Sequence, residues 1–258
     1  RPEKVIDLCR AAGIRTVPTG IDHGTVTAIL DEGPVEITTL RRDVSTDGRR
    51  ATVAFADDWR EDAARRDFTI NALYAHPKTL EITDFFGGLD DLAARRVRFI
   101  GDARTRIRED HLRILRYFRF QARFGREIED TALAACTELA ETLKGISRER
   151  VAMELLGILA LPDPVPTVRL MDKAGVLRVI LPEARAGEIA ALDRLVAQER
   201  EYAIAPDAIR RLAALLPPVQ SLAETVAARL RLSKQQRARL ACAAARHARV
   251  PARANAQA

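Results

Sequence analysis

The sequence predicts an α+β fold, in which a small unit of mixed strands and helices precedes a unit made of helices. Two β-branched runs, TVTAIL (25–30) and VEITTL (35–40), are separated by the turn signal DEGP and predict an antiparallel pair of strands. Before them, PEKVIDLCRAAG (2–13) has apolar residues at helical spacing and ends on Gly13, which predicts a helix packed on the pair. From about residue 100 onward the apolar residues recur at helical spacing.

Two stretches of the first unit predict a loop and a turn. RRDVSTDGRRA (41–51) contains four arginines and Gly48, and it predicts a basic loop beside a sheet edge, where a loop can move onto a phosphate. FFGGLDDL (85–92) predicts a turn at Gly87 and Gly88 that leads into a short helix. Neither stretch matches a P-loop, and the chain has no Gly-x-Gly-x-x-Gly motif.

The second unit opens with the strongest helix signal in the chain. REDHLRILRYFRFQARFG (108–125) predicts one helix that Gly125 closes. Further elements are predicted downstream: helices over 131–145, over 146–161 with Ser147 as N-cap and over 167–183, breaks at 162–166 and 217–218, and a frayed end over 248–258.

Composition narrows the classes of partner. The 258 residues carry a formal net charge of +6, and the basic excess is nearly all arginine, whose planar fork of donors suits phosphate. A polyanionic partner explains this charge, and so does a solvated surface of Arg-biased composition. We recognise no signal peptide and no window apolar enough to span a membrane, so the expected compartment is the cytoplasm and no membrane partner is expected.

Metal chemistry based on thiols or imidazoles is not expected. Cys9, Cys136 and Cys242 lie far apart, and the four histidines form no pair at ligand spacing. The thiols are predicted to be buried or free, and a metal site would have to consist of carboxylates. Glu36, in the predicted strand VEITTL, is one candidate because two-metal sites often use a strand carboxylate that faces a cleft. A solvent-facing glutamate fits the same alternation.

Glu109, Asp110 and Arg113 form the first candidate site. On a single helix Asp110 and Arg113 are i,i+3 neighbours, so an acceptor and a donor stand side by side and can pair with the Watson–Crick edge of a base, while Glu109 holds Arg113. Arg116 and Arg123 continue the same side and can meet a phosphate backbone. An ordinary surface ion pair, contributing a few tenths of a kcal/mol, explains the same spacing.

RRDFTINALY (65–74) contains the second candidate site. Arg65 and Arg66, beside Asp67, can hold a triphosphate and a ribose hydroxyl. The alternative is a helix start with Asp67 near its N-terminus, which the helix dipole favours. Either way Phe68, Ile70, Ala72 and Leu73 are predicted core residues, and Asn71 is either a backbone hydrogen-bond anchor or a ligand contact.

The order of these motifs carries a resemblance. The segments PTGIDHGTVTAI, VEITTLRRDVSTDGRRATV, DDWREDAARRDFTINALY, DFFGGLDDL, RVRFIGDARTRIREDHLRILRYFRFQARFG and ISRERVAMELLGIL follow one another from Pro18 to Leu159. This order resembles the bacterial class II tRNA nucleotidyltransferase (CCA-adding enzyme) and poly(A) polymerase family. The resemblance implies a polymerase-β-like nucleotidyltransferase head with a mixed sheet over residues 1–99, a helical neck over 100–160 and a helical, tRNA-binding body over 161–258.

The resemblance also implies a reaction and roles for the candidate residues. The 3′-hydroxyl of an RNA attacks the α-phosphate of CTP or ATP, pyrophosphate leaves, and two Mg²⁺ ions assist. Asp110 and Arg113 become the base-reading pair, with Glu109 orienting Arg113. The remaining candidates are expected to bind the nucleotide or support the metals: Arg65, Arg66, Asp67, Asn71 and Arg116 on the nucleotide, and Glu36 as the strand carboxylate.

One departure from the family pattern concerns the metal ligands. The family begins with a Gly-Gly or Gly-Ser turn and then an Asp-x-Asp pair; the start of this chain has neither, and no Asp-x-Asp follows Gly87-Gly88 further along. We therefore expect the pair to lie upstream of Arg1, the head to be incomplete, and the chain as given to have little or no activity.

Three functions follow from these expectations. The first is addition of the terminal CCA to tRNA 3′ ends. The second is poly(A) addition to RNA 3′ ends, because that enzyme shares most of these motifs. The third is a non-catalytic RNA-binding protein, which the missing Asp-x-Asp pair permits. The sequence leaves the oligomeric state open.

Overall fold

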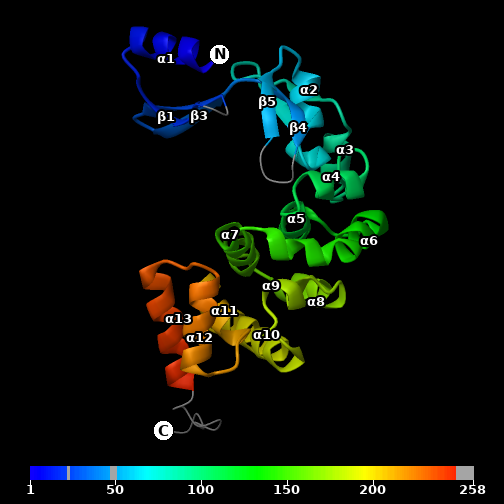
Figure 1. Cartoon of the computed structure of the whole chain (residues 1–258), viewed down its shortest axis with the longest axis vertical. Helices are drawn as coiled ribbons and strands as arrows, with labels where there is room; N and C mark the ends of the chain where they lie inside the picture. Colours follow the sequence, from blue (N-terminus) through cyan, green and yellow to red (C-terminus); the bar gives the residue numbers. More distant parts are fainter. Residues whose placement is uncertain (22–23, 47–50, 248–258) are drawn as a thin grey trace. The chain divides into compact units, whose positions relative to one another are not determined.

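A computed structural model of the chain describes residues 1–21, 24–46 and 51–247 (Figure 1). The chain divides into two compact units, one of Arg1–Asp91 with Phe99–Gly101 and one of Leu92–Arg98 with Asp102–Ala258. The first mixes strands with helices and the second is helical, so the predicted α+β class is confirmed. The predicted boundaries of head, neck and body stay a prediction.

The first unit starts with a helix on a three-stranded antiparallel sheet. α1 (Pro2–Ala11) packs against β1 (Arg15–Gly20) and β2 (Thr25–Leu30), and β3 (Gly33–Thr38) completes the order β1-β2-β3 (Figure 1). Val26 and Ala28 of the central strand are buried, as is Cys9 of α1. The predicted strand pair and its helix are therefore confirmed, and β1 is an additional strand.

In the basic stretch predicted as a loop, residues 41–46 form a strand and residue 51 begins another. β4 (Arg41–Thr46) pairs antiparallel with β5 (Ala51–Phe55). The loop prediction is wrong over 41–46 because backbone pairing, and not polar composition, decides the conformation of these residues. The part of the predicted loop over 47–50 lies outside the described residues.

Short elements follow, and they carry RRDFTINALY. They are α2 (Trp59–Ala64), the 3₁₀ helix η2 (Thr69–Asn71), β6 (Leu73–Ala75), β7 (Ile82–Asp84) and α3 (Gly88–Ala93). The Asp58 carboxylate caps α2 by accepting from the backbone N–H of Arg60 at 2.8 Å. Phe68 and Ala72 are buried as predicted, whereas Ile70 and Leu73 are half-buried.

The predicted turn at Gly87 and Gly88 leads into the short helix α3, as expected, and it brings α3 against η2. Gly87 has a φ of +75°, in the left-handed region that glycine adopts without strain. A Cβ on Gly88 would lie 2.3 Å from the Thr69 carbonyl oxygen, so the two backbones meet at this point. The Thr69 hydroxyl donates to the fully buried Asp91 carboxylate at 2.6 Å, which closes the contact.

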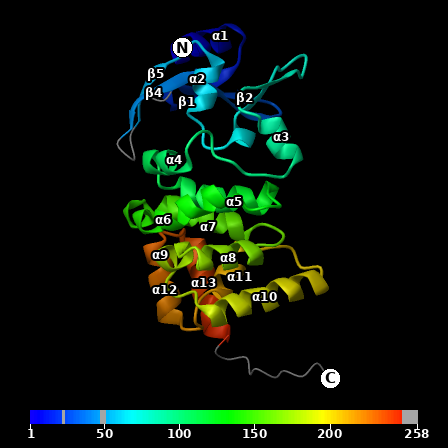
Figure 2. The same ribbon diagram turned by 90° about the vertical axis from the view of Figure 1, so that its right-hand side faces the viewer.

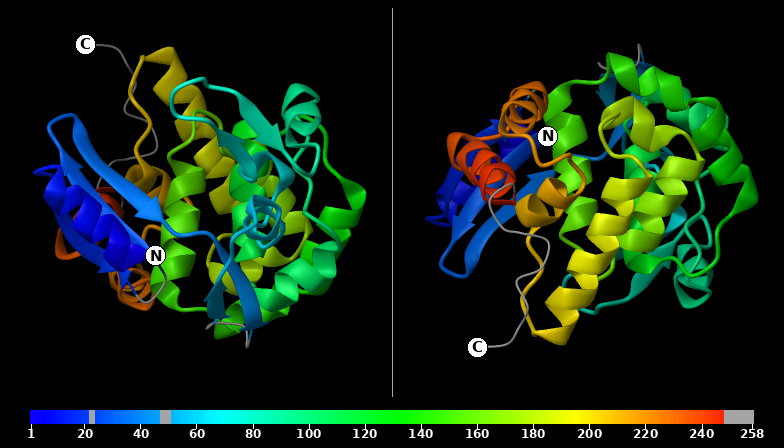
Figure 3. Two further views of the ribbon diagram at one scale, coloured as in Figure 1. Left: turned by 90° about the horizontal axis from the view of Figure 1, so that it is seen from above. Right: turned by 90° about the horizontal axis from the view of Figure 1, so that it is seen from below.

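The second unit is a stack of helices (Figure 2). α5 packs on α7 and α8, and α12 lies beside α13 (Figure 3). The elements are α4 (Ala103–Glu109), α5 (Arg113–Phe124), α6 (Asp130–Glu138), η3 (Ala140–Gly145), α7 (Arg148–Leu159), α8 (Val165–Lys173), α9 (Val176–Ile180), α10 (Ala186–Glu201), α11 (Ala208–Ala214), α12 (Gln220–Arg229) and α13 (Lys234–His247). No helix in the described part of the chain combines the length and apolar character needed to cross a bilayer.

These bounds correct one predicted helix and confirm the predicted breaks. The single helix predicted over 108–125 is wrong, because the chain leaves helical geometry between α4 and α5. α7 starts after Ser147 as predicted, although its hydroxyl makes no capping hydrogen bond. The breaks at 162–166 and 217–218 separate α7 from α8 and α11 from α12. The predicted frayed end over 248–258 lies outside the described residues.

A buried ion pair holds the second unit together. Arg211, 1% exposed, donates from Nε to Oε2 of Glu199 at 2.8 Å and from Nη1 to the carbonyl oxygen of Leu159 at 2.7 Å. It also donates to the carbonyl oxygens of Leu161 and Pro162. The Glu199–Arg211 pair therefore fastens α10 and α11 to the backbone that follows α7.

Candidate functional site

The arginine pair of RRDFTINALY follows the C-terminal end of α2, where one carboxylate holds both side chains. Arg65 donates from Nε to Oδ1 of Asp62 at 2.9 Å, and its Nη2 lies 2.8 Å from the same oxygen. Arg66 donates from Nη2 to Oδ2 at 3.3 Å. The alternative, a helix start with Asp67 near its N-terminus, is met by the short 3₁₀ helix η2, which begins at Thr69, whereas the arginines themselves follow α2 and Arg65 is its C-cap.

Aromatic rings complete this cluster. Tyr74 of β6 donates its hydroxyl to Oδ2 of Asp62 at 2.8 Å, and the guanidinium of Arg66 lies over the Tyr74 ring, 5.3 Å from its centroid. The ring of Trp59 meets Tyr74 edge-on at 5.0 Å between centroids. Burial alone would raise the pKa of Asp62, but the Tyr74 hydrogen bond and the Arg65 charge outweigh it, so the pKa is lowered.

Asp67 and Asn71 lie together just after the arginines. Asp67 is 5% exposed, and its Oδ1 accepts from the Asn71 side-chain amide at 2.9 Å and from the backbone N–H of Phe68 at 3.0 Å. The anchor predicted for Asn71 is thus a contact with the Asp67 side chain. The predicted nucleotide-binding roles of both residues stay predictions.

The Glu109–Arg113 contact is present, but the helix predicted around it is interrupted. Oε2 of Glu109 accepts from Nη1 of Arg113 at 2.5 Å and from Nη1 of Arg106 at 3.0 Å. Nη1 of Arg113 also donates to the carbonyl oxygen of Arg106 at 2.9 Å. Two acceptors therefore fix one edge of the Arg113 guanidinium.

Asp110 lies in the turn between α4 and α5, so the prediction that Asp110 and Arg113 share one helix is wrong. Its φ and ψ of −153° and 104° are extended. Oδ1 accepts from the backbone N–H of Leu112 at 3.1 Å, and this local hydrogen bond competes with helix continuation. Oδ2 accepts from Nη2 of Arg150 on α7 at 2.6 Å, a partner that the sequence did not suggest.

Arginines and phenylalanines share the surface of α5. Arg116 lies over the Phe120 ring at 5.4 Å, and its Nη1 is 3.8 Å from the buried Glu154 carboxylate. Arg123 lies over Phe124 at 5.2 Å. The predicted contact of Arg116 with nucleotide or phosphate stays a prediction, and its charge is partly offset by Glu154 of α7.

The described residues do not form a metal site. Glu36 is exposed on β3, opposite Thr27 of β2. Within residues 1–21, 24–46 and 51–247, no group of three or more His, Cys, Asp or Glu side chains could hold a metal ion. A two-metal centre needs more carboxylates than Glu36 alone, so no reaction step is assigned to a metal here. Cys9 and Cys136 are buried free thiols and Cys242 is an exposed one, as predicted.

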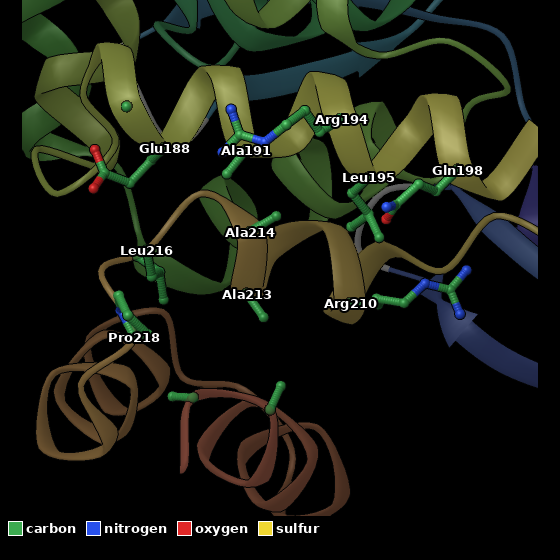
Figure 4. A pocket seen from close by; sticks show the side chains of 13 residues that line it. Glu188, Ala191, Arg194, Leu195, Gln198, Arg210, Ala213, Ala214, Leu216 and Pro218 are labelled. Atoms are coloured by element: carbon green, nitrogen blue, oxygen red, sulfur yellow. The ribbon is translucent and has the colours of Figure 1, made fainter. Parts of the chain in front are cut away.

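A cavity in the second unit contains none of the predicted site residues. It has a volume of about 430 Å³ and lies among α10, α11 and α13 (Figure 4). Arg194 and Gln198 of α10 stand at its side, and Ala213 and Ala214 of α11 line it (Figure 4). Small apolar side chains dominate its wall, so it offers little of the convergent polar chemistry that a catalytic site needs.

Comparison with known families matches two domain models to the chain. The model described as "Poly A polymerase head domain" matches residues 1–98. The model described as "Probable RNA and SrmB-binding site of polymerase A" matches residues 125–187. The Asp62 cluster falls within the first match, and Glu154 and Arg150 fall within the second.

Individual proteins are similar over most of the chain. The mitochondrial CCA tRNA nucleotidyltransferase 1 of Danio rerio is 39% identical over 241 residues, which covers 92% of this chain and 54% of that protein. The Homo sapiens protein of the same name is 48% identical over 163 residues, covering 61% of this chain and 37% of that protein. The chain thus spans about half or less of these relatives.

The fold is also similar to that of solved structures. The crystal structure of Bacillus stearothermophilus CCA-adding enzyme in complex with CTP superposes with a TM-score of 0.75 at 27% identity. The superposition covers 92% of this chain and 57% of that one.

Proposed function

Because the chain belongs to the class II CCA tRNA nucleotidyltransferase family, we propose that it is part of an enzyme that adds C, C and A to tRNA 3′ ends. The activity of the similar CCA tRNA nucleotidyltransferases supports this proposal, and the CTP complex of the B. stearothermophilus enzyme supports CTP as a substrate. The substrates of the proposed reaction are a tRNA 3′ end with CTP and then ATP.

One observation carries the proposal: the fixed guanidinium of Arg113. An enzyme that selects a base without a template needs a donor side chain held in one orientation, and Glu109 with the Arg106 carbonyl oxygen supplies that restraint. Asp110 provides an acceptor three residues earlier, and Arg150 restrains it from α7. These contacts support the pair as the reader of the base edge.

The proposed reaction is a nucleotidyl transfer, in which CMP or AMP is joined to the tRNA 3′ end. The 3′-oxygen of the tRNA attacks the α-phosphorus and loses its proton, the bond from the α-phosphorus to its bridging oxygen breaks, and pyrophosphate leaves with that oxygen. Arg65 and Arg66 would bind the negatively charged triphosphate before attack and the pyrophosphate after it. We propose that the reaction requires Mg²⁺. The cytoplasm stays the predicted compartment of the protein.

A second candidate is poly(A) addition. It is favoured by the description of the matched head model, which is named for poly(A) polymerase. The same residues would then read adenine alone, because a poly(A) polymerase does not use CTP.

A primer-extension assay tests the proposal. The chain, and any longer form its gene encodes, is incubated with Mg²⁺, CTP, ATP and a tRNA that lacks its last three nucleotides, and products are sized at single-nucleotide resolution. Growth by C, C and A followed by a stop supports CCA addition. A ladder of A residues without C supports poly(A) addition. Binding of tRNA with no extension by any form would contradict both and leave the non-catalytic RNA-binding protein.

Variants of the base-reading pair sharpen this assay. We expect Asp110→Ala or Arg113→Ala to lower the preference for the correct nucleotide roughly 10- to 100-fold, since one hydrogen-bonded base contact contributes about 1–3 kcal/mol of discrimination. The affinity for tRNA should change much less. Arg169→Ala, which removes an exposed pair with Asp193, is the control. An equal loss of tRNA affinity would instead place Asp110 and Arg113 on the RNA surface.

A further inference from the structure

We propose that Asp62 is a positioning residue, which holds the guanidinium groups of Arg65 and Arg66 in place to bind the triphosphate of the incoming nucleotide. The inference rests on the proposed function, because the triphosphate belongs to CTP or ATP. It adds a residue that neither the sequence motif nor the matched domain models single out. Three features of the first unit support the proposal. They are the groups that donate hydrogen bonds to Asp62, the difference in burial between the carboxylate and the arginines, and the elements that meet at the carboxylate.

The first feature is that donors occupy both oxygens of Asp62. Oδ1 accepts from the Arg65 side chain and from the backbone N–H of Arg41 at 3.2 Å. Oδ2 accepts from Arg66 and from the Tyr74 hydroxyl. A carboxylate has about four lone-pair positions, and these contacts fill them. Asp62 therefore has no capacity left for a metal ion or a substrate proton, and its action must pass through the arginines.

The second feature is that the carboxylate is buried while the arginines reach the surface. The Asp62 side chain is 4% exposed, whereas Arg65 and Arg66 are 18% and 34% exposed. One negative charge beneath two positive charges lowers the repulsion between neighbouring guanidinium groups and leaves a net charge of +1 facing outward. This arrangement suits a polyanion, because the guanidinium groups are accessible while the carboxylate is buried.

The third feature is that three segments of the chain, α2 with the residues just after it, β4 and β6, meet at Asp62. Asp62 belongs to α2, Arg41 begins β4, the arginines follow α2, and Tyr74 belongs to β6. The Tyr74 ring also supports the Arg66 guanidinium from below. Nε of Arg66 is buried and has no acceptor in the described part of the chain, so this guanidinium is held by Asp62, by the Asn71 carbonyl oxygen and by the ring.

A purely structural role for Asp62 makes a different prediction. If Asp62 only stabilised the head, its replacement would lower the stability of the unit without a specific change in triphosphate affinity. A matched control is available at the start of the same helix: Asp58→Ala removes the α2 cap from an exposed position and should cost about 1 kcal/mol of stability. Asp58 makes no contact with the arginine pair among the described hydrogen bonds.

The test uses Trp59 as the reporter, since it is the one tryptophan in the sequence and its ring contacts Tyr74. Fluorescence of the intact chain is titrated with sodium tripolyphosphate, which does not absorb, and with CTP. Asp62→Asn should weaken tripolyphosphate binding at least tenfold relative to the wild type. Asp62→Glu should restore part of the affinity, and Asp58→Ala should bind as the wild type does while unfolding at a lower temperature.

The outcomes separate this inference from the proposed function. Equal affinities of Asp62→Asn and Asp58→Ala would overturn the positioning role and leave CCA addition intact. A wild-type chain that binds neither tripolyphosphate nor CTP would overturn both. Weakened binding in Asp62→Asn, together with no nucleotide addition in the primer-extension assay, would support the positioning role and contradict the proposed reaction.

Discussion

Each unit contains a pair of adjacent arginines, and each pair contacts its own buried carboxylate. Arg65 and Arg66 meet Asp62 in the first unit, and Arg210 and Arg211 meet Glu199 in the second. The two carboxylates are almost equally buried, at 4% and 3% exposure. The two sites thus share an arginine pair and a buried carboxylate, and they differ in the other groups that the guanidinium groups contact.

The difference lies in which atoms complete the guanidinium hydrogen bonds. Arg211 is 2% exposed in its side chain, and backbone carbonyl oxygens of the segment after α7 take its remaining donors. Arg66 leans on an aromatic ring and is 34% exposed. The comparison teaches that a buried arginine such as Arg211, with its donors taken by a carboxylate and several backbone carbonyl oxygens, fastens the fold, whereas Arg65 and Arg66 keep exposed guanidinium surface that can bind a ligand.

The largest expected effect comes from breaking the buried pair. Glu199→Gln leaves the Arg211 charge without its counter-ion in a site that water does not reach, which should lower the free energy of unfolding by roughly 3–5 kcal/mol. Urea unfolding followed by the helical circular-dichroism signal measures it. A loss below about 1 kcal/mol would mean that the carbonyl oxygens alone hold Arg211, and the comparison would fail.

A smaller loss of stability is expected at Asp62. Asp62→Asn should lower the free energy of unfolding by about 1–3 kcal/mol, because hydrogen bonds to an ionised group are lost while the arginines can regain water. Urea unfolding followed by Trp59 fluorescence reports on the first unit directly. A loss as large as that of Glu199→Gln would make Asp62 a fastener of the fold as well.

The acid side of the stability profile should also change at Asp62. Its pKa is lowered below the ordinary value of 3.8, so its contribution is present above that value and is lost as the pH falls through the lower, folded-state pKa. The stability gap between wild type and Asp62→Asn should therefore narrow as the pH falls below 3.8. Urea midpoints measured from neutral to acid pH check this, and a gap that stayed constant would contradict it.

The smallest effect is expected at Arg210. Its side chain is 37% exposed and Glu199 keeps Arg211 after its removal, so Arg210→Ala should cost about 1 kcal/mol or less. Comparison with Glu199→Gln in the same urea experiment shows whether the two neighbours contribute as unequally as their burial indicates. Equal losses would show that Glu199 needs both arginines.

The parts of the fold that were predicted correctly depend on local patterns. α1 and its Gly13 stop, the β2–β3 pair and the proline-marked breaks each follow from residues within a few positions of one another. β1 was missed because it contains Pro18, which the edge position of this strand tolerates. β4 was missed because its composition is polar, although Asp47-Gly48 is a frequent hairpin signal.

The contacts of the candidate site also divide into local ones, which the sequence spacing predicts, and distant ones, which it does not. Asp62 stands three and four residues before Arg65 and Arg66, a helical spacing that predicts ion pairs and that we overlooked. The Arg150 contact with Asp110 spans 40 residues, and the Arg119 contact with Glu154 spans 35. Such partners depend on how α5 and α7 pack, which periodicity along a single segment does not specify.

Gly88 has a consequence for reading variants of this chain. Any side chain there would collide with the Thr69 carbonyl oxygen and push η2 away from α3. η2 lies a few residues after the arginine pair, so this shift would reach the site. A missense change at residue 88 would therefore impair the site without altering any residue assigned to it. The loss of function of such a variant would have a steric cause, because every amino acid other than glycine has a Cβ atom at this position.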